Sequence, residues 1–118
     1  MGQELLKPNA SKILASVQFE QGFHFTTKNG VYMGLTATSL TDFASKLETV
    51  DVDSILFHYP RGDFQKWIED TLGDTELANR LCFVKTNLSG EQLRKELVKI
   101  VQKRLNELKG PWLSRSDV

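Results

Sequence analysis

Apolar residues along this 118-residue chain follow two patterns, one alternating and one that repeats every three or four residues. The alternating pattern comes early, where two β-prone runs surround the dipeptide Asn29-Gly30. Both residues tolerate positive φ, so the dipeptide is a strong signal for a hairpin turn. We therefore predict a β-hairpin over about residues 22–37, with Phe23 and Phe25 on its core face.

The segment before this hairpin fits two structures. Residues 13–19 alternate as a strand does, but Ile13, Leu14 and Val17 would also share one face of a helix. We favour the extended segment. Residues 1–12 are polar and show no period, so we expect a flexible N-terminal arm.

Beyond residue 38 the apolar residues recur at helical spacing, and capping or glycine residues separate the runs. Ser89 and Gln92 form a capping box, and Gly110-Pro111 ends the helix that follows. The other expected caps and turns are Ser39, Gly62, Asp63, Gly73 and Asp74. These signals predict four helices, over about residues 39–49, 63–72, 74–84 and 89–109.

Residues 52–59 fit a further short helix. Asp51 or Asp53 would cap it, and Pro60 would end it because proline disfavours helical geometry in the residue before it. The alternative is a buried strand in which every second residue is apolar, namely Ile55, Phe57 and Tyr59.

The elements together predict an α+β fold, in which the N-terminal hairpin packs against the helices. The length suits one globular domain, which we place at residues 13–110, followed by a C-terminal tail at 111–118. Trp112 in that tail either docks on the domain or marks a partner surface.

Composition narrows the classes of function. Basic and acidic residues number 15 each, so no overall charge attracts nucleic acid or an anionic membrane. The chain has no apolar run near the ~18 residues that a membrane helix needs. The single cysteine, Cys82, excludes an internal disulfide and fits a reducing compartment. We expect a soluble, cytoplasmic protein.

A block in the middle of the chain carries a resemblance. Its motifs are F-H at 57–58, G-D-F-x-x-W-I at 62–68, L-G-D at 72–74 and E-L-A at 76–78. This pattern resembles an uncharacterised domain family of archaeal and bacterial proteins, over about residues 23–81. The chain departs from it at Pro60, where the family pattern leads us to expect a more helix-compatible residue. The resemblance implies no fixed chemistry and an accessory or interaction role.

His58 is the candidate residue that most needs an explanation. Its neighbours in the sequence are aromatic, and Arg61 and Asp63 follow closely, so it could be a titrating switch or a general base. We favour a structural histidine bonded to a backbone carbonyl or to Asp63, since an imidazole among apolar residues needs a partner in any fold. If the chain binds a small ligand, we expect the site at His58 and Arg61. His24, His58 and Cys82 lack metal-ligand spacing, so we predict no metal.

The last predicted helix carries a basic stripe, Lys95, Lys99 and Lys103, at i, i+4 spacing. Arg94 and Arg104 lie beside it. Acidic residues interrupt this surface, and Glu91 is spaced to pair with Lys95, so a solvated face is favoured over a footprint for RNA or DNA.

The residues show no catalytic constellation and point to no cofactor. We therefore predict a non-catalytic interaction or accessory module that binds an unknown protein partner or further copies of itself. The alternatives are nucleic-acid binding through Lys95, Lys99 and Lys103, and a small-ligand site around His58.

Overall fold

A computed structural model of the chain describes residues 10–27, 29–85 and 87–115, without the side chains of residues 111–115. An antiparallel hairpin and a set of helices confirm the α+β class. The elements in chain order are α1 (Ala10–Leu14), η2 (Phe19–Gln21), β1 (Phe23–Thr26), β2 (Tyr32–Ala37), α2 (Leu40–Leu47), α3 (Val52–Arg61), α4 (Asp63–Trp67), η3 (Ile68–Leu72), α5 (Thr75–Leu81) and α6 (Gly90–Arg115).

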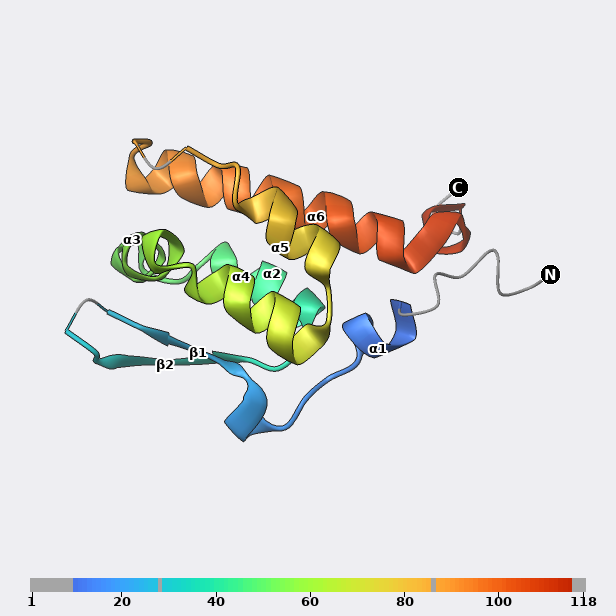
Figure 1. Cartoon of the computed structure of the whole chain (residues 1–118), viewed down its shortest axis with the longest axis horizontal. Coiled ribbons are helices and arrows are strands. Elements are labelled where there is room, and N and C mark those ends of the chain that lie inside the picture. The colour runs from blue at the N-terminus through green and yellow to red at the C-terminus, as the bar shows by residue number, and fades with distance from the viewer. Residues whose placement is uncertain (1–9, 28, 86, 116–118) are drawn as a thin grey trace.

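The elements are stacked in layers (Figure 1). The hairpin lies on one side, the long helix α6 on the opposite side, and α2, α3 and α4 between them. α5 packs against α4 and α6. Although α6 is 26 residues long, it carries many charges, and no helix in the described part of the chain is apolar enough over sufficient length to cross a membrane.

The predicted hairpin is confirmed, with Phe23 and Phe25 both buried. Its loop is longer than a two-residue turn, and Gly30 at φ 77° provides the left-handed residue. Phe23 lies opposite Ala37 and Thr26 opposite Tyr32, so β2 contains more residues than β1 between these pairs. Gly34 at φ 78° lies in this irregular stretch. A bulge at an edge strand increases its twist and discourages pairing with another sheet.

The extended segment expected over residues 13–19 is wrong at its start, because Ala10–Leu14 form helix α1. Ala10 and Ile13, a turn apart, are both buried, and α1 contacts α2 and α6. Burial of one helical face therefore outweighed the alternating pattern. Residues 10–12, which the sequence assigned to the arm, therefore belong to a packed helix, and residues 1–9 of the expected arm lie outside the described residues.

The short helix expected over residues 52–59 is confirmed as α3, capped by Asp51, which excludes the strand alternative. The prediction that Pro60 ends the helix is wrong, since α3 continues to Arg61. Proline lacks a backbone N–H and so removes one helical hydrogen bond, and this single loss in the last turn does not end the helix. The helix instead ends at Gly62, which takes the left-handed conformation at φ 77°.

The tryptophan helix predicted over residues 63–72 is confirmed as α4 continued by a wider π-helical turn, η3, and it ends at Gly73 with φ 79°. Asp63 was expected to cap this helix, and that prediction is wrong. The cap position is Gly62, and Asp63 is the first helical residue, with its carboxylate turned to other partners. Asp74 does cap α5, accepting the N–H of Leu77.

The two ends of the chain's longest helix match the sequence signals. Ser89 and Gln92 exchange the reciprocal hydrogen bonds of a capping box. Gly110, at φ 76° and ψ 173°, interrupts the helix where Gly-Pro predicted its end. One further helical turn follows. Whether the Trp112 side chain docks lies outside what the structure describes.

A buried ion pair joins α5 to α6. The Arg104 guanidinium donates two hydrogen bonds of 2.9 Å to the carboxylate of Asp74, and both residues are buried. Arg104 also reaches Glu107, which in turn binds Arg80 through two bonds of 2.9 and 3.0 Å. The hydrogen bonds that it donates to Asp74 raise the pKa of Arg104, so the pair stabilises the charged guanidinium. Arg104 is thus part of the interior, although the sequence placed it beside a basic surface.

We predict that Arg104→Met lowers the free energy of unfolding by about 3–5 kcal/mol, because it leaves a buried carboxylate without its counter-charge. Lys103→Met, at the exposed neighbouring position, should change it by less than about 0.5 kcal/mol. Urea denaturation measures both variants. Equal unfolding midpoints for the two would show that the buried pair contributes nothing.

Candidate functional site

His58 lies at the junction between the hairpin and α3. Its Nε2 accepts the backbone N–H of Thr26 at 2.9 Å, and its Nδ1 is 2.8 Å from Asp63 Oδ2. Since Nε2 must accept from an amide, the ring proton belongs on Nδ1, which donates to Asp63. One turn earlier on α3, Ser54 Oγ donates to the carbonyl of Thr26 at 2.7 Å. α3 thus satisfies both backbone groups of Thr26.

The surroundings of His58 favour its neutral form. The ring is buried against Phe23, with centroids 4.7 Å apart, and against Phe64 at 5.5 Å. Burial lowers the pKa of His58, more than the bond to Asp63 raises it. Burial would raise the pKa of Asp63, but hydrogen bonds from His58 and Arg61 outweigh it and lower that pKa.

Both nitrogens of His58 therefore have partners within the chain, which gives the residue a structural role. The partner is a backbone N–H rather than the expected carbonyl, together with the expected Asp63. A general base needs a nitrogen that can reach a substrate proton. His58 offers none in this arrangement.

Arg61 is separated from His58 by the Asp63 carboxylate that they share. Its Nε donates to Asp63 at 2.9 Å, its guanidinium lies 4.7 Å from the centre of the Phe57 ring, and its side chain is largely exposed. It borders an open hollow of about 540 Å³, which is lined also by Thr27, Asn29, Asp53, Leu56 and Phe57. The structure thus places Arg61 at the surface and His58 in the interior, and does not bring them together around one cavity.

The basic face of α6 is smaller than the sequence indicated. Lys95, Lys99 and Lys103 are exposed, and Lys99 is 3.9 Å from Glu96. Arg94 donates to the carbonyl of Leu47 and to Glu91. The expected Glu91–Lys95 pair is therefore wrong, because Glu91 binds the arginine three residues away instead.

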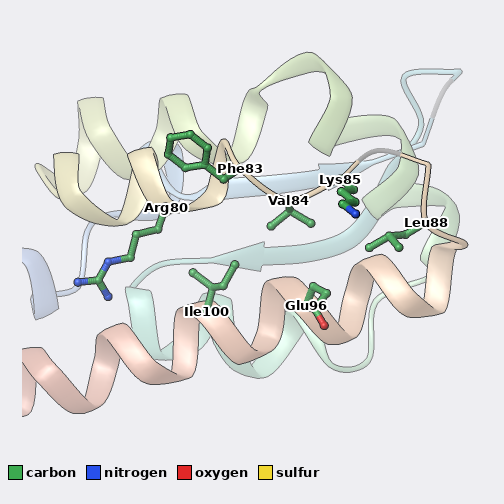
Figure 2. A pocket seen from close by; sticks show the side chains of 7 residues that line it. All are labelled: Arg80, Phe83, Val84, Lys85, Leu88, Glu96 and Ile100. Carbon is green, nitrogen blue, oxygen red and sulfur yellow. The ribbon is translucent and has the colours of Figure 1, made fainter.

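Phe83, which follows α5 and is 85% exposed, was not among the predicted site residues. It lies beside a hollow of about 360 Å³ between the turn after α5 and the side of α6. Figure 2 shows the residues that line this hollow, which we call the Phe83 surface: Arg80, Phe83, Val84, Lys85, Leu88, Glu96 and Ile100. A signal existed. In a helix extended to Val84, Phe83 falls off the apolar face formed by Leu77, Ala78 and Leu81.

The turn that carries Phe83 is hydrogen-bonded to the buried Tyr59 of α3. The Tyr59 hydroxyl shares its one proton between the carbonyls of Leu81 and Val84, the second at 2.9 Å. Tyr59 is buried, and burial raises the pKa of its hydroxyl, so it remains a donor. The backbone on both sides of Phe83 is thereby fixed while the ring itself points to solvent.

A family model matches residues 59–117, half of the chain, and its description is a family of unknown function (DUF5752). The chain belongs to the DUF5752 family. This confirms the expectation of an uncharacterised domain. No curated protein and no solved structure matches the chain.

The DUF5752 segment contains the whole Phe83 surface and the Tyr59 that supports it. The hairpin and most of α3, including His58, precede the matched residues. In the described part of the chain, no group of three or more histidine, cysteine, aspartate or glutamate side chains is arranged to hold a metal ion.

We predict that His58 makes the folded chain less stable as the pH is lowered below 6.5. Its pKa is below the ordinary 6.5 in the folded chain, so below pH 6.5 the unfolded chain binds a proton that the folded chain does not. The free energy of unfolding should therefore decrease as pH falls from 6.5. His58→Gln should remove this part of the slope, whereas His24→Gln, on the half-buried outer face, should keep it. Urea unfolding at pH values from about 5 to about 8, which bracket the ordinary histidine pKa, measures this pH dependence. An unchanged slope in His58→Gln would show that His58 is not its source.

We predict that Tyr59→Phe lowers the free energy of unfolding by about 1–3 kcal/mol, because two carbonyls lose their donor. Amide exchange at residues 82–84 should also become faster. Tyr32→Phe, which removes a hydroxyl bonded to Thr36 at the exposed hairpin face, is the control and should cost less than about 1 kcal/mol. Equal exchange rates at residues 82–84 in Tyr59→Phe and the unmodified chain would refute this support.

Proposed function

We propose that this chain is a non-catalytic protein-interaction module that binds its partner through the Phe83 surface. The observation that carries the proposal is the 85% exposure of Phe83 on a backbone turn that Tyr59 holds in place. A large exposed aromatic ring costs solubility and does not contribute to the core, and such rings beside apolar hollows are typical of partner surfaces.

The composition of the Phe83 surface supports this proposal. Half-buried Val84, Leu88 and Ile100 line the same hollow as the exposed ring, together with the charged Arg80, Lys85 and Glu96. Protein interfaces usually combine apolar side chains with charged and polar ones. The engagement of both His58 nitrogens also favours a role without catalysis.

Nucleic-acid binding through α6 receives less support. Arg104 is buried in an ion pair and Arg94 is bonded to Leu47 and Glu91, so only the lysines remain as exposed cations of that face. Glu96 lies between them, close to Lys99. A phosphate footprint needs a denser cluster of cations.

We predict that a photo-crosslinking benzoyl-phenylalanine in place of Phe83 captures a specific protein from extracts of the source cells, or a second copy of the chain. The matched control replaces Val31, which is 58% exposed but lies in the hairpin away from the hollow. Phe83→Ser should prevent binding of the captured protein without loss of stability, since the ring is outside the core.

Size-exclusion chromatography of Phe83→Ser and Val31→Ser completes the comparison. Crosslinks that are the same at positions 83 and 31, together with identical elution of both variants and the unmodified chain over a range of concentrations, would contradict the proposal.

A further inference from the structure

The wall of the Phe83 surface formed by the turn after α5 has few backbone groups to offer a ligand. The N–H groups of Cys82, Phe83 and Val84 donate to carbonyls one turn earlier, and Tyr59 occupies the carbonyls of Leu81 and Val84. An extended peptide binds by adding a strand to a row of open backbone groups. Residues 82–84 have no such row of free N–H groups, so an extended peptide cannot pair with them as a β-strand.

The opposite wall is the side of α6, whose backbone is used within the helix. Glu96 and Ile100 face the hollow from successive turns. Figure 2 shows the turn after α5 running alongside α6, with Arg80 and Leu88 toward opposite ends. A ligand between these walls must satisfy its own backbone and offer side chains, as an α-helix does.

The charges at the rim define the chemistry of that helix. Lys85 and Lys103 are exposed and take part in no ion pair among the described residues, and Lys103 lies one turn from Ile100 on α6. Lys99, the neighbour of Ile100, forms a loose ion pair with Glu96, 3.9 Å away. Arg80 is paired more closely, with Glu76 and Glu107. The charge left for a partner is therefore positive, which favours carboxylates and disfavours lysines.

We infer that the Phe83 surface binds an amphipathic helix of a partner protein, whose apolar side chains meet Phe83, Val84 and Ile100 and whose flanking carboxylates meet Lys85 and Lys103. This inference rests on the proposed function and specifies the partner. The apolar residues of such a helix recur at i, i+3 or i+4, and i+7, because these positions share one face.

A displayed library of helical peptides of about four turns, with randomised residues, tests this inference. The sole cysteine, Cys82, is exposed and next to Phe83, so a fluorophore attached there reports binding of each selected peptide. We expect enriched peptides with apolar residues at helical spacing and an excess of Asp and Glu over Lys and Arg. Phe83→Ser should weaken them about thirtyfold, as loss of a central aromatic anchor does, while Val31→Ser should leave their affinity unchanged.

Charge reversal provides the second arm. The double variant Lys85→Glu and Lys103→Glu should weaken the acidic peptides about tenfold and select basic peptides in a repeated screen. Enrichment without acidic bias, or enriched sequences that are extended rather than helical, would overturn the inference. If crosslinking at position 83 still captures a partner in that case, the interaction module stands and only the chemistry of its partner is wrong.

Discussion

The attachment of Thr26 to α3 is the interaction on which the arrangement of the molecule depends. A two-stranded hairpin has two open edges and is only marginally stable alone. At Thr26 the edge of β1 is closed by side chains one turn apart on α3, His58 for the N–H and Ser54 for the carbonyl. Because the imidazole must accept from an amide, it must remain neutral, and its burial among aromatic rings enforces this. The hairpin is therefore docked in one register.

The same helix supports the proposed binding surface from its other side. Tyr59 follows His58 in α3 and holds the two carbonyls that bracket the turn of Phe83. α3 thus connects the hairpin, which lies outside the matched DUF5752 segment, to the Phe83 surface within it. The buried pair of Asp74 and Arg104 fixes α5 against α6, the two elements between which the hollow lies. These polar interactions hold the backbone around the hollow in place, and the Phe83 ring, the most exposed of the large apolar side chains in the described part of the chain, projects beside it.

Local signals in the sequence predicted the hairpin, the helix starts and the α+β class, because turns and caps depend on neighbouring residues. They failed where the cause was distant. Thr26, which donates to His58, is 32 residues away in the chain and was not predicted. Asp63 was expected both as a cap and as the partner of His58, and the structure has only the second role. Arg104 lies between Val101 and Leu108 at core-facing spacing, a signal that its charge concealed. The exposure of Phe83 could have been predicted, because this residue falls off the apolar face of a helix over residues 74–84; α5 itself ends before it, at Leu81.

The tautomer of His58 tests most directly the claim that this residue, at the centre of the domain, has a structural role. Long-range proton–nitrogen NMR correlations at neutral pH report which ring nitrogen carries the proton. The account predicts a neutral ring with the proton on Nδ1 and an unprotonated Nε2 coupled through the hydrogen bond to the Thr26 amide. A proton on Nε2, or a charged ring exchanging freely with water, would contradict it and return His58 to the list of residues available for chemistry.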